Sequence, residues 1–148
     1  MLSDTLQSLF TRDLNRLRNE IELYRKEENI WRVEEQIANS AGNLCLHLVG
    51  NLNTHIGQQI GKTGYVRNRE LEFSIKNVSK TKLLIKIDET RVIVDTVLAT
   101  LDDNKLAIEY PILVFEERTS TGYMLVHLAT HLSYHLGQIN YHRRLLDR

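Results

Sequence analysis

The chain has 148 residues, with 19 Lys and Arg against 19 Asp and Glu, so its formal net charge at neutral pH is zero. This balance argues against a nucleic-acid-binding protein, which needs a cationic excess to neutralise phosphates, and against an anionic membrane surface as a partner. The length suits one domain over residues 1–148. With one cysteine, no segment that resembles a signal peptide and no apolar run long enough to span a bilayer, we expect a cytoplasmic protein.

The first half of the chain is predicted to form two helices and a long connection. Apolar residues recur every three or four positions over about residues 3–28, which predicts a helix with one apolar face. A second helix is predicted from Ser40, which suits an N-cap, to Ile60, where Gly61 would end it. Residues 61–77 carry two glycines, several charges and no helical period, and this pattern is typical of a connection.

The second half is predicted to contain two further helices, separated by a short β segment. Helical spacing returns over residues 80–101 and is followed by a turn signal at 102–104. Over residues 106–116 apolar residues alternate around Pro111, which favours two short strands or one bent edge strand. The last helix is predicted over 119–146. These elements together predict an all-α four-helix bundle with a long second connection and a short β excursion before the last helix.

The six histidines are the most informative residues for function. His127, His131 and His135 are four residues apart, so neighbours lie one turn apart on one helix face, where a pair can chelate one metal ion. The second helix offers His47 and His55, which are about 12 Å apart along the axis and so unlikely to share an ion. One of them with a pair from the last helix would supply three nitrogen ligands and leave positions open for water or substrate. Core histidines that only form hydrogen bonds are the alternative, and spacing alone leaves the two interpretations balanced.

Three segments resemble a known family. Residues His131–Gln138 read H-L-S-Y-H-L-G-Q, which is similar to the H-x-x-x-H-x-G-Q motif in the last helix of the DinB-like (DinB/YfiT-type) metal-binding superfamily. The stretches NSAGNLCLHLVGNL (Asn39–Leu52) and RNRELEF (Arg67–Phe73) resemble a largely uncharacterised branch of it. The resemblance follows the element order of nearly the whole chain.

The resemblance implies a four-helix bundle, commonly a homodimer, that holds a divalent metal ion with three histidines. Matched by motif, the ligands are His47, His131 and His135. His127 is the reserve ligand if the register of the last helix differs, and His55 matches no ligand position. Zn²⁺ or Ni²⁺ is the expected ion, with Fe²⁺ or Mn²⁺ as alternatives, because nitrogen ligands do not select strongly among these metals.

Characterised members of the superfamily include metal-dependent thiol transferases that use bacillithiol, mycothiol or glutathione, and a maleylpyruvate isomerase. The resemblance therefore implies transfer of a small-molecule thiol to an electrophile. A metal-dependent hydrolase is an alternative, which is weakened because no general base lies beside the three histidines in the sequence. A non-catalytic dimer that binds a metal or ligand is a third possibility, and the sequence does not choose among them.

Five other residues are candidates around such a site. Asn51 and Gln138 lie on the histidine-bearing helices and would orient a ligand histidine or contact substrate, with Gln138 preferred for its place in the motif. Arg67 and Arg69 would pair with the carboxylates of a low-molecular-weight thiol, although a solvated loop is the commoner explanation for such residues. Gly137 is expected to permit close helix packing, with no chemistry of its own.

Overall fold

The computed structural model describes residues 1–148, and its regular structure is entirely helical. The all-α prediction is therefore confirmed. None of the helices has the length and apolarity needed to cross a bilayer. The elements are α1 (Leu2–Glu22), a 3₁₀ turn η1 (Glu27–Trp31), α2 (Ala41–Leu52), a π-helical segment η2 (Asn53–Gln58), α3 (Arg69–Ser74), α4 (Lys80–Leu98), α5 (Asp103–Leu106) and α6 (Thr121–Leu146).

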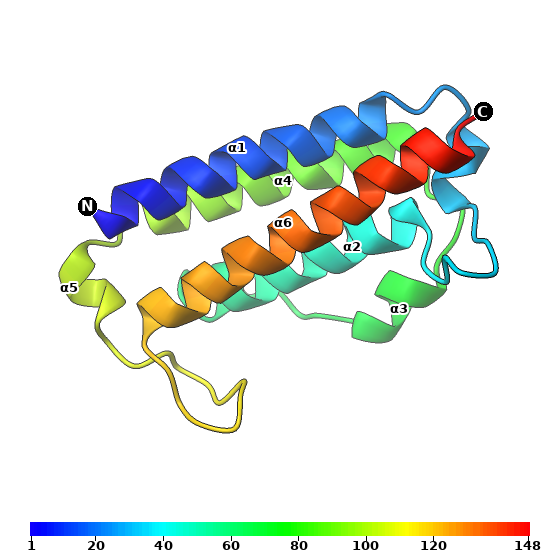
Figure 1. Ribbon diagram of the computed structural model, residues 1–148. Coiled ribbons are helices and arrows are strands. Elements are labelled where there is room, and N and C mark those ends of the chain that lie inside the picture. Colours follow the sequence, from blue (N-terminus) through cyan, green and yellow to red (C-terminus); the bar gives the residue numbers. More distant parts are fainter.

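The four long helices lie lengthwise against one another (Figure 1). Helices α1 and α6 run in one direction and α2 and α4 in the other, so the connection between α2 and α4 must return along the molecule. Helix α1 packs against α4 and α6, and α2 packs against the same two helices. Their apolar faces meet in one cluster of 28 buried residues, in which α1 contributes Leu6, Phe10, Leu14, Leu17 and Ile21 at the predicted helical spacing.

Serine side chains cap the start of three of these helices. Ser40, Ser79 and Ser120 each accept a hydrogen bond from a backbone N–H three residues further on, at 3.1–3.2 Å. Each cap satisfies one of the N–H groups that a first turn leaves without a partner. The start predicted at Ser40 is confirmed.

The first helix is shorter than its apolar period predicts, since α1 ends at Glu22 rather than near residue 28. The cause is a tertiary contact with the other end of the chain. The Asp147 carboxylate accepts hydrogen bonds from the backbone N–H groups of Arg25 and Lys26, at 2.6 and 3.2 Å, and from Asn29 Nδ2 at 2.9 Å. The chain therefore leaves the helical path to reach the end of α6.

The predicted β excursion is wrong. Residues 106–116 form no strand, and the region holds only an isolated bridge between Glu109 and Ser120, with two backbone hydrogen bonds of 2.8 Å beside it. Alternation requires a neighbouring strand to become a sheet, and the Tyr110 side chain is instead buried among the helices at 1% exposure. The turn predicted at 102–104 is the start of α5, which Asp102 caps.

The long connection is present, but it contains a helix that the sequence pattern did not predict. Helix α3 has six residues, too few to show an apolar period, and the Asn68 side chain caps its first turn. Asn43 of α2 holds it in place, because Asn43 Nδ2 donates to the carbonyls of Glu72 and Ile75, both at 2.9 Å. This anchor places the Glu72 side chain against α2.

Candidate metal centre

Three histidines from two helices meet between α2 and α6. Nε2 of His131 lies 3.2 Å from Nε2 of His47 and 3.1 Å from Nε2 of His135. One ligand atom from each of the three lies within 4.8 Å of the others, which is close enough for all three to hold one metal ion. The two α6 histidines are one turn apart, as their spacing requires, and His47 faces them from α2.

The outer ring nitrogens of two of these histidines are held by hydrogen bonds. His47 Nδ1 lies 3.1 Å from Glu72 Oε1, and His135 Nδ1 lies 2.7 Å from the side-chain oxygen of Gln138. Both oxygens accept, so each Nδ1 carries the hydrogen and each Nε2 keeps a lone pair. Such outer partners are what orient metal-binding histidines in proteins. Gln138, a candidate named for its place in the motif, is thus in contact with His135.

Neither neutral tautomer of His131 satisfies all the hydrogen-bonding nitrogens of this cluster. Its Nδ1 is buried without a partner. With the hydrogen on Nδ1, a buried donor is unpaired and three lone pairs face one another; with it on Nε2, only one neighbouring lone pair is met. A cation between the three nitrogens would meet all three lone pairs. Two nitrogens bound tetrahedrally to one zinc ion lie about 3.3 Å apart, close to the spacings found here, so the residues fit a metal ion.

The environment keeps the rings of His131 and His47 in the neutral form that binds metals. Burial, with His135 and His47 nearby, lowers the pKa of His131 from 6.5 to about 4. Burial also lowers the pKa of His47, although the Glu72 carboxylate acts in the opposite direction. A metal ion would therefore displace few protons from these two residues at neutral pH.

Glu72 is a residue that the sequence did not single out. Its side chain is 7% exposed and pairs with Arg67, which donates from Nε to one carboxylate oxygen at 2.8 Å and from Nη2 to the other at 2.9 Å. Arg67 therefore supports Glu72, and through it His47, rather than leaving its whole guanidinium free for substrate. The R-x-R-x-x-E pattern within Arg67–Phe73 was visible, but only the fold brings it beside His47.

A cavity of about 460 Å³ opens onto the centre. His47 and His131 form part of its wall, together with Asn51, His55, Arg67, Arg69, Val114, Met124, His127 and Leu128. The reserve ligand His127 lies one turn before His131 with its ring stacked on it, centroids 6.3 Å apart, and is not one of the three converging residues. His55, which matched no motif position, lies in η2 and lines the same cavity.

The match to a family model covers the centre entirely. The family described as "Protein of unknown function (DUF1572)" matches residues 5–148, a range that includes the three histidines, Glu72 and Gln138. The chain belongs to the DUF1572 family. No curated protein matches this DUF1572 member. The match to the family model therefore extends from the first turn of α1 to the last residue.

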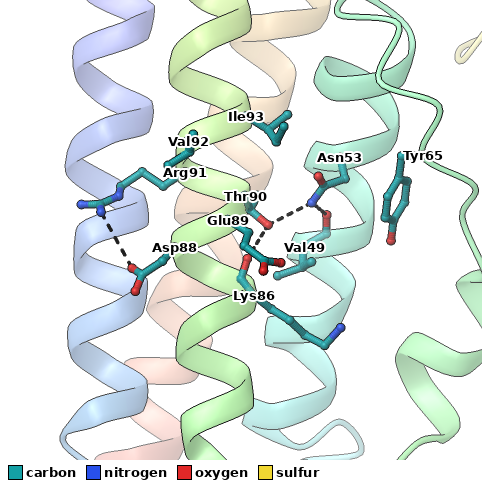
Figure 2. Close-up of a pocket in the computed structure, with 10 residues that line it drawn as sticks. All are labelled: Val49, Asn53, Tyr65, Lys86, Asp88, Glu89, Thr90, Arg91, Val92 and Ile93. Carbon is teal, nitrogen blue, oxygen red and sulfur yellow. Dashed lines mark hydrogen bonds and ion pairs between the residues drawn. The ribbon is translucent and has the colours of Figure 1, made fainter.

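A larger hollow on this DUF1572 member is elsewhere and has no comparable chemistry. It measures about 680 Å³ and lies between α4 and α2, with Tyr65 of the connection on its far side (Figure 2). Its buried polar groups bond to one another: Asn53 Nδ2 donates to the Val49 carbonyl and to the Thr90 hydroxyl, which donates to the Lys86 carbonyl. No histidine lines it.

Replacing Gly50 or Gly137 of this DUF1572 member by alanine is expected to have opposite effects on stability. A Cβ on Gly50 would collide with the Glu72 carboxylate, whereas one on Gly137 would meet nothing within 4 Å, so the expectation that Gly137 permits close helix packing is wrong. We expect Gly50→Ala to cost about 1–3 kcal/mol and to weaken metal binding by displacing Glu72. Gly137→Ala is the control and should stabilise α6 by up to about 1 kcal/mol. Urea unfolding of both variants tests this, and equal effects would contradict it.

Buried histidines predict acid sensitivity of the metal-free chain. Burial lowers the pKa of His55 and His131 from 6.5 to about 4, and it also lowers the pKa of His142, whose ring bonds to Tyr24 and to the Arg32 carbonyl. The folded state then binds fewer protons than the unfolded state below pH 6.5, so stability is full above that pH and falls as the pH drops toward 4.

Urea unfolding between about pH 7 and pH 5 should show this loss, because carboxylates contribute little in that range. The matched variant His55→Gln should lose less stability over the same interval. A free energy of unfolding that is constant, or that rises toward pH 5, would contradict the assignment of these rings as neutral.

Proposed function

We propose that this DUF1572 member is a DinB-like four-helix-bundle protein that binds a divalent metal ion through His47, His131 and His135, and transfers a low-molecular-weight thiol to an electrophile. The observation that carries the proposal is the convergence of three Nε2 atoms beside an open cavity. The H-x-x-x-H-x-G-Q motif and membership of DUF1572, a DinB-like family, support it. Zn²⁺ or Ni²⁺ is the proposed ion.

The residues around the three histidines have defined tasks in this proposal. A bound ion would act as a Lewis acid that favours the deprotonated form of a thiol. Glu72 and Gln138 keep the Nδ1–H groups of His47 and His135 turned outward, so that both Nε2 lone pairs point inward. The rest of the cavity wall beside His47 and His131 is then left to hold the substrates.

A panel of thiols tests the proposal. Metal-loaded protein is mixed with bacillithiol, mycothiol or glutathione and with monochlorobimane as the electrophile. We expect thiol loss that depends on added metal and disappears in His131→Ala. No turnover across the panel, or equal turnover in that variant, would contradict thiol transfer. Metal binding that raises thermal stability without any turnover would favour a non-catalytic metal-binding protein.

A metal-dependent hydrolase is a second candidate, which His55 supports. Tyr110 donates its hydroxyl hydrogen to the His55 carbonyl at 2.6 Å. The Tyr110 hydroxyl oxygen can therefore only accept in its contact with the His55 ring, so His55 Nδ1, 3.3 Å away, carries the hydrogen. This leaves a lone pair on His55 Nε2. The site therefore contains a neutral proton acceptor, which the sequence alone did not reveal.

Ester hydrolysis without any thiol distinguishes this candidate. Metal-loaded protein that cleaves 4-nitrophenyl acetate, and loses about 100-fold in rate when His55 is replaced by Gln, would favour a hydrolase. Equal rates in wild type and His55→Gln would contradict a role for His55 in hydrolysis.

A homodimer remains a proposal taken from the family resemblance, and light scattering that gives the monomer mass of 17.3 kDa would contradict it.

A further inference from the structure

The cavity beside the three histidines has an unusual charge balance. None of the ten residues that line it is Asp or Glu, whereas two of them are arginines. The Glu72 carboxylate, which contacts the cavity residues His47 and Arg67, is 6% exposed and already paired with both. A concave surface with cations and no acidic side chain favours an anion, and a divalent ion at the histidines would add to this preference.

The two arginines are not equivalent. Arg67 directs both Nε and Nη2 at Glu72, and its side chain is only 17% exposed. Arg69 forms no ion pair within the chain, and its guanidinium carbon lies 5.9 Å from the centre of the Phe73 ring. Stacking on an aromatic ring leaves the edge of a guanidinium free to donate. Arg69 is therefore the cation available to a ligand.

Asn51 provides a second, independent indication of a ligand. Its residue is 8% exposed, it lines the cavity, and its side-chain oxygen is buried without a hydrogen-bond partner. A buried polar group left unpaired costs about 1–3 kcal/mol, so such groups usually meet a partner that arrives from outside the chain. The unpaired atom is an amide oxygen, which only accepts, so the partner that it fits is a hydroxyl or an N–H group of a ligand.

We propose that this cavity binds a small organic acid that also carries a hydroxyl or amino group, with Arg69 as the ionic partner of the carboxylate and Asn51 Oδ1 as the acceptor for the hydroxyl or amino hydrogen. One free guanidinium can pair with the two oxygens of a carboxylate, whereas a phosphate dianion needs more donors. The volume is sufficient for a metabolite-sized ligand. The proposal deepens the proposed function and rests on it for the choice of this cavity, but the anion site uses only residues of the chain.

Calorimetric titration with succinate tests the ionic contact, and neutral succinamide is the matched ligand control. Malate adds one hydroxyl to succinate and should bind more tightly, because Asn51 Oδ1 can accept from that hydroxyl; equal affinity for the two would overturn the role given to Asn51. Metal-free and zinc-loaded protein should both bind succinate in preference to succinamide. Arg69→Gln should weaken succinate binding about tenfold. Arg144→Gln is the control variant, because Arg144 is another exposed arginine stacked on an aromatic ring, 5.2 Å from the Tyr141 centroid, and it should leave binding unchanged.

The outcomes separate this proposal from the proposed function. A chain that takes up no zinc yet binds succinate through Arg69 overturns the metal site and supports the anion site. A chain that binds zinc but shows no saturable succinate binding, or equal affinity for succinamide, overturns the anion site alone. Unchanged affinity in Arg69→Gln, or an equal loss in Arg144→Gln, also overturns it.

Discussion

Replacing His131 by alanine is expected to abolish metal binding while the chain stays folded. His131 lies between the other two histidines, with its Nε2 3.1–3.2 Å from both of theirs, so its loss removes the central nitrogen. Changes to outer partners alone typically cost about 10–100-fold in metal affinity, and we expect a larger loss here. Competition with a chromophoric zinc chelator measures it, and circular dichroism reports the fold.

His127→Ala is the matched control for this prediction. His127 lies on the same helix, one turn away, and lines the same cavity, but it is outside the converging group. We expect its replacement to leave zinc affinity nearly unchanged. If His127→Ala removed binding and His131→Ala did not, the register of α6 in the proposed site would be wrong and the reserve ligand would take its place.

Replacing Glu72 by alanine is expected to produce the largest loss of stability. The change would leave the Arg67 guanidinium, 17% exposed, without its ion-pair partner, and breaking a buried pair from one side costs about 3–5 kcal/mol. His47 would also lose the oxygen that holds its Nδ1–H, so zinc affinity should fall by about 10–100-fold. Urea unfolding and zinc competition measure the two effects separately.

Two further variants separate the charge of Glu72 from its shape. Glu72→Gln keeps an oxygen that accepts from His47 Nδ1–H but loses the charge that pairs with Arg67, so it should lose stability and keep most of its zinc affinity. Glu70→Ala changes an exposed carboxylate on the same helix and should affect neither property. Equal losses in Glu70→Ala and Glu72→Ala would contradict the role given to Glu72.

Features that depend on nearby residues could be predicted from the sequence. The spacing of His131 and His135 fixes their relation on one helix, and the apolar period of α1 matches its buried face. The motif around His47 identified that histidine as the partner of His131 and His135 across the core. The Gln138 contact follows for the same reason, because residues three apart on a helix are neighbours.

Features that depend on tertiary contact could not be predicted in this way. Glu72 belongs to a six-residue helix that Asn43 anchors from 29 residues away, and no local period marks it. His55 bonds to Tyr110, 55 residues further along the chain, and no local spacing predicts that pair. Alternation around Tyr110 indicated strands, but packing of its side chain among helices determined the structure.

The most direct test of the metal centre is the metal content of the protein itself. Chain purified without chelators, and a second sample reconstituted with Zn²⁺ and passed through a desalting column, are measured by elemental analysis. The convergence of His47, His131 and His135 predicts about one metal ion per chain in the reconstituted sample. A protein that holds no metal in either sample would contradict the central claim.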